Sequence, residues 1–220
     1  MLVTSSGEAL GTIGGGGLER RLIDEALDAL RLGEPRNLHF AMGVPAREGM
    51  ISVNSKCGGE VKIFMDVLKP EPRLIIMGSG LIAKAVARYS FDCGFHVTVV
   101  DDADTATADN FPGVELVNDA YPGSLTQVDI RPSDYVAMLH GETEFELAGL
   151  RHTVEARPAF IGLLGSGNKA KEHKRQLKEE GYDPETVDAI KGPIGLEIGA
   201  ETPEEIAVSI VAELIEVRRG

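Results

Sequence analysis

Short apolar runs alternate with amphipathic segments through the second two thirds of the chain. Runs of this length bounded by turn residues indicate buried strands, and apolar residues at three- and four-residue spacing indicate helices. The strand-like runs cover residues 74–77, 96–100, 114–117, 135–139 and 159–164. Strands that alternate with helical segments predict an α/β fold of Rossmann type, with a mainly parallel sheet and helices on both faces.

The first third of the chain has a different pattern. Apolar residues recur at helical spacing across residues 18–30. Strands are expected on either side of this helix, at residues 2–5, 10–13, 37–42, 50–53 and 60–68, the first two forming a hairpin. The sequence Pro70-Glu71-Pro72 then marks a boundary before the second part of the chain.

Composition narrows the class of protein. A chain of 220 residues with 43% hydrophobic content is long and apolar enough for a folded core. Its formal net charge of −13 argues against a general nucleic-acid surface. The sequence contains no membrane-spanning run, no signal core and only two cysteines, so we expect a cytoplasmic protein without a disulfide framework.

The first strand-like run of the second part stops at a glycine turn. Gly78-x-Gly80-x-x-Ala83, with Ser79 between the glycines, is the alanine-ended form of the dinucleotide-binding turn. The first glycine makes the bend, and the second lets a pyrophosphate approach the N-terminus of the next helix. Asp101 stands where an acid usually accepts hydrogen bonds from the adenosine ribose. Alternatively, these are ordinary turn residues of a βαβ unit without a nucleotide.

Two more candidate sites follow later strands at the same predicted edge, where parallel sheets bind ligands. His140 directly follows a strand and is expected to act as an acid, a base or a ligand, or only as a structural hydrogen-bonding residue. Gly165, Ser166 and Lys169 follow the last strand. They offer amides, a hydroxyl and a cation to a phosphate, without the spacing of a P-loop.

Another group of glycines, Gly15, Gly16 and Gly17, lies directly before the predicted N-terminal helix. Successive backbone amides in such a run can cradle an anion, and the absence of side chains also lets two chain segments pack closely. Spacing alone favours neither interpretation.

Cys57 lies between Lys56 and the pair Gly58-Gly59. A neighbouring cation and flexible glycines favour an accessible thiolate that is reactive or binds a metal. The alternative is a small residue in an ordinary turn.

Five segments stand in a fixed order along nearly the whole chain. They are Gly11-Thr-Ile-Gly-Gly-Gly-Gly-Leu-Glu19, Cys57-Gly-Gly59, the turn at Gly78, Gly162-Leu-Leu-Gly-Ser166 with Lys169, and Pro193-Ile-Gly-Leu-Glu-Ile-Gly199 with Thr202-Pro-Glu-Glu-Ile-Ala207. Together they resemble the xanthine dehydrogenase accessory factors, the XdhC/CoxI family. The resemblance implies a homodimer with a small α+β domain at residues 1–70 and a Rossmann-type domain at residues 71–220.

The family looks like a set of maturation factors for molybdenum hydroxylases, without turnover of their own. The resemblance implies that the chain binds molybdenum cofactor, as molybdopterin or its nucleotide form. It further implies support for sulfuration by a cysteine desulfurase and for insertion into an apo xanthine dehydrogenase-type hydroxylase. Gly15, Gly16, Gly17, Glu19 and the segment 57–59 would hold the cofactor, with Cys57 as metal ligand or sulfur-relay thiol. Relatives usually carry a cysteine where this chain has Gly17.

Two other classes of protein remain open from the residues themselves. One is an NAD(P)-dependent oxidoreductase that holds NAD(P) at Gly78 and Asp101 and uses His140 as acid or base. The other is a nucleotide-sensing module without chemistry. Hydride transfer to a carbonyl would indicate the enzyme, and nucleotide binding without pterin or turnover would indicate the sensor.

Overall fold

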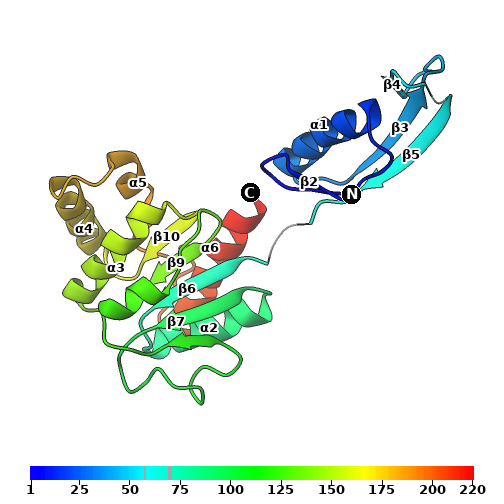
Figure 1. The fold of residues 1–220 in the computed structure, drawn as a ribbon. Coiled ribbons are helices and arrows are strands. Elements are labelled where there is room, and N and C mark those ends of the chain that lie inside the picture. Colours follow the sequence, from blue (N-terminus) through cyan, green and yellow to red (C-terminus); the bar gives the residue numbers. More distant parts are fainter. Residues whose placement is uncertain (57, 69–70) are drawn as a thin grey trace. The chain divides into compact units, whose positions relative to one another are not determined.

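The computed structural model of the chain describes residues 1–56, 58–68 and 71–220. It divides into two compact units, residues 1–70 and 71–220, each with its own hydrophobic core (Figure 1). Cys57 lies outside the described residues, so the predicted thiolate there stays a prediction. Among the described residues, none of the helices is both long and apolar enough to cross a bilayer.

The smaller unit packs one helix on a three-stranded sheet. β3 (Arg36–Met42) lies in the middle, parallel to β4 (Ile51–Val53) and antiparallel to β5 (Gly59–Met65). The apolar stripe of α1 (Gly17–Leu32) packs on the buried face of this sheet. The unit therefore buries one face of its sheet, as the alternating pattern of β3 requires.

A two-stranded hairpin precedes α1. β1 (Leu2–Val3) and β2 (Ala9–Leu10) pair in antiparallel register, so the predicted hairpin is present. Its strands are two residues long and do not extend over residues 2–5 and 10–13 as predicted, because glycines and turn residues surround them.

The larger unit is built on a five-stranded sheet in which every pair of neighbours is parallel. In spatial order the strands are β10 (Phe160–Leu163), β9 (Tyr135–Met138), β6 (Arg73–Met77), β7 (His96–Val100) and β8 (Glu115–Val117). β6, the first strand in the chain, lies at the centre of the sheet. Strand order therefore reverses on either side of β6, as in a Rossmann-type fold.

Helices cover both faces of this sheet (Figure 1). Leu74 and Ile76 of β6 pack under α2 (Leu81–Asp92) and α6 (Pro203–Arg219), and the alternate residues of the same strand face the other core. The helices of that second core are α3 (Thr143–Ala156), α4 (Gly167–Glu179) and α5 (Pro184–Ala189). The predicted parallel sheet with helices on both faces is confirmed.

The predicted alternation of strands and helices is wrong around β8. Residues 101–114 connect β7 to β8 through turns alone, and only the short 3-10 helix Gly123–Gln127 separates β8 from β9. Aspartate, proline and glycine residues in these connections favour turns over a helix. Thr105 in the first of these connections comes back to the carboxyl end of β6, where its hydroxyl is 2.5 Å from that of Ser79.

The N-terminus of α6 has a complete capping box. Glu205 N donates to the Thr202 hydroxyl at 3.3 Å, and Thr202 N donates to the Glu205 carboxylate at 3.1 Å. Losing an N-cap side chain typically costs about 1 kcal/mol. We expect Thr202→Ala to lower the free energy of unfolding by about that amount in a urea titration, and Thr202→Ser to change it much less. Equal losses in both variants would argue against the capping bond.

Candidate functional site

The central strands of the larger unit end level with one another. Met77 at the end of β6 is in register with Val100 of β7 and with Met138 of β9, and Met138 is in register with Leu163 of β10. The turns that follow these strands therefore gather at one edge of the sheet. This edge carries the predicted residues at Gly78, Asp101, His140 and Gly165.

Gly78 makes the bend after β6 against the backbone of the next strand. Its φ is +117°, and a Cβ at this position would lie 2.7 Å from both Cα and N of His140. Its own amide donates to Val100 O at 2.9 Å. Only glycine fits this conformation and this close approach.

Gly80 has the opposite surroundings. It is the N-cap of α2, with an ordinary φ of −69°, and a Cβ here would meet nothing within 4 Å. No side chain caps this helix, and its first turn contains no acidic residue. The first amides of α2 therefore have no side-chain cap at the positive end of the helix dipole, which is the arrangement that binds phosphate groups.

Asp101 is turned away from solvent, with 3% of its surface exposed. Its Oδ2 accepts a hydrogen bond from the Ser79 hydroxyl at 2.6 Å, and its Oδ1 accepts one from Asp102 N at 2.9 Å. The predicted ribose contact of Asp101 would have to reach a carboxylate that is already hydrogen-bonded and almost fully buried. Of the two neighbouring aspartates, Asp102 is the exposed one.

His140 lies beside this carboxylate. Its Nε2 is 3.5 Å from Asp101 Oδ1, and only 11% of its side chain is exposed. The imidazole stacks on the ring of Phe145, with centroids 4.3 Å apart and planes 3° from parallel. Its Nδ1 is buried and has no hydrogen-bond partner among the described residues. Packing, not hydrogen bonding, therefore fixes the orientation of the ring.

Tyr121 supports the same region from the connection that follows β8. Its hydroxyl donates to Phe145 O at 2.8 Å, and its backbone N donates to Asp102 Oδ2 at 3.2 Å. Burial, reinforced by the charge of Asp101, raises the pKa of the Tyr121 hydroxyl. The hydroxyl therefore stays protonated and keeps its role as a donor.

Lys169 is tied to a buried carboxylate. Its Nζ lies 2.6 Å from Glu146 Oε2 and donates to Gly141 O at 3.1 Å. Glu146 is fully buried; it also accepts a hydrogen bond from Gly141 N at 3.1 Å and contacts His173 Nε2 at 3.0 Å. Because its ammonium group is already paired, Lys169 holds two turns of the edge together rather than presenting a free cation.

Ser166 caps the helix that follows the last strand. Lys169 N donates to its hydroxyl at 3.3 Å, so α4 has the side-chain cap that α2 lacks. Gly165, just before it, has a φ of +136° and packs against the aliphatic part of Lys169. Of the two predicted phosphate cradles, the one at Gly80 is the more open.

The glycine run of the smaller unit cradles an anion from its own chain. The Glu19 carboxylate accepts hydrogen bonds from Gly15 N at 2.9 Å, from Ile13 N at 3.1 Å and from the Thr12 hydroxyl. These bonds, that of Thr12 foremost, lower the pKa of Glu19.

Both interpretations of this glycine run have a structural counterpart. Gly15 supplies an amide to an anion, and Gly16 precedes the helix with a φ of +75°. Gly17 makes a close approach, because a Cβ there would lie 3.1 Å from Asn54 O. Gly58 directly precedes β5, and Gly59 is the first residue of that strand.

The structure adds residues that the sequence patterns did not indicate. Asp102, Phe145 and Glu146 contact predicted site residues, and Tyr121 and His173 contact Asp102 and Glu146 in turn. Phe145 and Glu146 lie in the first turn of α3, shortly after His140, and Asp102 directly follows Asp101, so proximity in sequence was the available signal for these three. Tyr121 and His173 come from segments that are distant in sequence.

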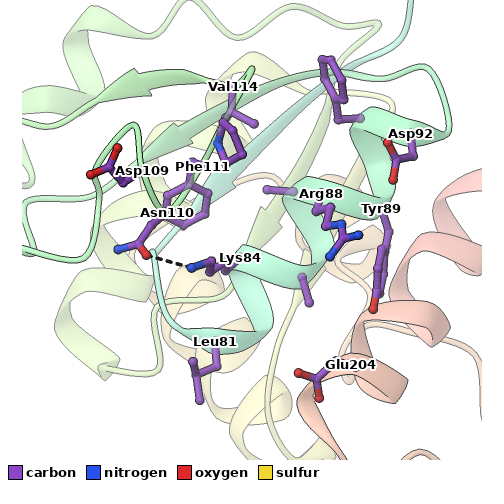
Figure 2. Close-up of a pocket in the computed structure, with 14 residues that line it drawn as sticks. Leu81, Lys84, Arg88, Tyr89, Asp92, Asp109, Asn110, Phe111, Val114 and Glu204 are labelled. Atoms are coloured by element: carbon purple, nitrogen blue, oxygen red, sulfur yellow. Dashed lines mark hydrogen bonds between the residues drawn. The ribbon is translucent and has the colours of Figure 1, made fainter.

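A pocket of about 660 Å³ lies along the outer side of α2, apart from the polar edge (Figure 2). It is bounded by the helix, by residues 109–112 and by Glu204, and Lys84 Nζ donates across it to Asn110 Oδ1 at 2.8 Å. Its described lining includes none of the predicted site residues, and it approaches the glycine turn only at Leu81. The candidate site is therefore the strand edge, not this pocket.

Comparisons with known proteins agree with this architecture. The chain is 36% identical over its whole length to an uncharacterized protein, YqeB, of Escherichia coli, covering 40% of that protein. It is 33% identical over 71% of its length to a protein of Bacillus subtilis described as a probable xanthine dehydrogenase subunit, covering 46% of it. The chain thus spans less than half the length of these two relatives.

A third relative and a solved structure are more distant. The molybdenum cofactor insertion chaperone PaoD of Escherichia coli is 23% identical over 99% of this chain and 77% of its own length. A crystal structure described as a xanthine dehydrogenase from Bacillus halodurans superposes with a TM-score of 0.62 at 23% identity, covering 91% of this chain and 67% of that one. This structural likeness supports the fold.

Family models match both units. The model of the XdhC and CoxI family matches residues 1–41, and the model of the XdhC Rossmann domain matches residues 74–214. The second match alone covers more than half of the chain. It includes the C-terminal ends of β6, β7, β9 and β10 and the N-terminal ends of α2 and α4, which form the polar edge. The chain therefore belongs to the XdhC and CoxI family.

Proposed function

We propose that this protein binds molybdenum cofactor as cargo and supports its insertion into a molybdenum hydroxylase. Family membership supports this role, as does the likeness of nearly the whole chain to a protein named as a molybdenum cofactor insertion chaperone. The structural observation that carries the proposal is the uncapped N-terminus of α2, with open space at Gly80. A phosphate-bearing pterin supplies the anion that such a helix end binds.

The residues at the edge suit an anionic cargo in two ways. Gly80 leaves room where any side chain would project toward the ligand, and the helix dipole favours negative charge there. We further propose that Gly78, Ser79, Asp101, His140 and the turn at residues 165–169 line the rest of the site. The two units would act as two domains, with the glycine run and Cys57 of the smaller one also handling the cargo.

A matched pair of substitutions at Gly80 tests the phosphate cradle. Aspartate and asparagine are nearly isosteric, both are good N-caps, and the backbone at Gly80 has the extended conformation that N-caps adopt. Only aspartate adds a negative charge where the phosphate would bind. We expect Gly80→Asp to weaken binding of molybdopterin about 10- to 100-fold more than Gly80→Asn, measured by pterin fluorescence after oxidation of the bound fraction.

The same two variants separate the possible outcomes. Equal affinities in Gly80→Asp and Gly80→Asn would contradict a phosphate at this helix end.

Titration of the unaltered protein with NAD and NADP distinguishes a maturation factor from an oxidoreductase. Tight NAD(P) binding with hydride transfer, and no retained pterin, would favour an oxidoreductase over a maturation factor.

The finer roles are proposals of the same kind. We propose that the protein acts in the cytoplasm as a homodimer, and that a cysteine desulfurase supplies sulfur to the cargo through Cys57.

The role of Cys57 can be tested against a second cysteine of the chain. Cys93, at the C-terminal end of α2 and half-buried, offers a matched control. We expect Cys57→Ser to abolish most activation of an apo-hydroxylase by the protein, and Cys93→Ser to leave it intact. Full activation by Cys57→Ser would contradict the sulfur-relay role.

A further inference from the structure

Three metal-ligating side chains converge at the carboxyl ends of β7 and β9. One ligand atom from each of Asp101, Asp102 and His140 lies within 4.8 Å of the other two. Around an ion with bonds of about 2.1 Å, opposite ligand atoms lie about 4.2 Å apart. Neighbouring ligand atoms lie closer, at about 3.0–3.4 Å, so the 3.5 Å between His140 Nε2 and Asp101 Oδ1 nearly fits one coordination sphere. Asp102 is exposed, so a small rotation of its side chain can close the difference.

His140 gives an independent indication that a ligand is bound here. Its Nδ1 is buried without a partner among the described residues, and its Nε2 is 3.5 Å from Asp101 Oδ1, beyond the usual hydrogen-bond distance. A buried polar atom without a partner is rare and calls for an unseen water or ion. The stack on Phe145 holds the ring with Nε2 toward Asp101, so Nε2 is the nitrogen placed to bind a cation, and Nδ1 would then carry the ring proton toward a water.

Each carboxylate also accepts a hydrogen bond from outside the cluster. The Ser79 hydroxyl holds the buried Asp101 through Oδ2, and the backbone amide of Tyr121 donates to Oδ2 of the exposed Asp102, which can still rotate about that bond. Hydrogen bonds of this kind orient the carboxylate ligands of metal sites. Two adjacent negative charges beside an unpaired imidazole are also stabilised by a cation between them.

We propose that Asp101, Asp102 and His140 bind one divalent transition-metal ion, of which Mn²⁺ is the representative. Carboxylates suit Mn²⁺, and an imidazole ligand favours transition metals over Mg²⁺ and Ca²⁺. Three protein ligands leave coordination positions for water or for oxygens of an anionic ligand at the same edge. None of the three ligands is a backbone amide of the phosphate cradle at Gly80, although they lie at the same edge of the sheet.

A titration of the full chain with Mn²⁺, with free Mn²⁺ followed by electron paramagnetic resonance, tests this site. We expect one ion per chain, and at least tenfold weaker binding in Asp102→Asn and in His140→Phe, which keeps the aromatic stack but removes both nitrogens. Asp104→Asn, an exposed aspartate two residues further on, is the matched control and should bind like the unaltered protein. Cys57→Ser should also bind normally.

Circular dichroism of each variant establishes that it is folded. The proposal is overturned if the unaltered protein binds neither Mn²⁺ nor Zn²⁺ at millimolar concentration, or if folded His140→Phe binds as tightly as the unaltered protein. The titration contains no pterin or nucleotide. Its result is therefore independent of whether the protein carries molybdenum cofactor.

Discussion

Replacing Gly78 with alanine should lower the free energy of unfolding of the larger unit by about 2–6 kcal/mol. Two effects add at this position. The φ of +117° is strained for any residue with a side chain, typically by about 1–3 kcal/mol. The new methyl group would also lie 2.7 Å from backbone atoms of His140, and relieving such a clash costs about 1–3 kcal/mol more.

Gly80 provides the control within the same turn. Gly80→Ala places its methyl group in open space on a backbone with a φ of −69°, so its cost should stay below about 1 kcal/mol. Urea titration of the full chain, followed by circular dichroism, measures both changes. Similar destabilisation by the two variants would show that the close contact between the glycine turn and His140 is not formed.

Replacing Glu146 with alanine should have an effect of similar size, about 3–5 kcal/mol. The carboxylate is fully buried, and its loss would leave His173 Nε2 and the Gly141 amide without this partner and the Lys169 ammonium with a carbonyl but no counter-charge. Removing one partner from a buried ion pair is strongly destabilising because the remaining charge is desolvated without compensation. Reduced stability, measured by urea titration, should therefore accompany loosening of the turns at residues 140–141 and 165–169.

Glu144 lies in the same turn of α3 and is exposed, so Glu144→Ala is the matched control and should change stability by less than about 0.5 kcal/mol. Glu146→Gln should fall between the two, because the amide keeps an acceptor for Gly141 N but loses the charge. A loss below about 1 kcal/mol in Glu146→Ala would mean that this network does not hold the edge together.

Local patterns predicted the parts of the fold that depend on neighbouring residues. The apolar run of β6, the bend at Gly78 and the helix start at Gly80 are adjacent in sequence, and backbone geometry alone specifies them. The parallel sheet could be predicted because several apolar runs along the chain are each followed by a turn and a helix. The connections around β8 departed from the pattern because their turn residues replace the expected helices.

The polar edge was less predictable because its contacts join distant segments. Glu146 looks like an ordinary acidic residue near a helix N-terminus, and only the packing of α4 buries it against Lys169 and His173. The burial of Asp101 depends likewise on Ser79, which comes 22 positions earlier. Spacing identified which residues reach the edge, and tertiary contacts decided which of them are already paired.

Amide NMR of the labelled protein can show whether the first amides of α2 bind the phosphate of a pterin cargo, as we propose. Addition of molybdopterin should shift the amide signals of Leu81, Ile82 and Ala83 in a saturable way, and Gly80→Asp should abolish the shifts. If molybdopterin binds and shifts amide signals elsewhere in the chain while these three signals stay unchanged, the phosphate does not bind at the N-terminus of α2.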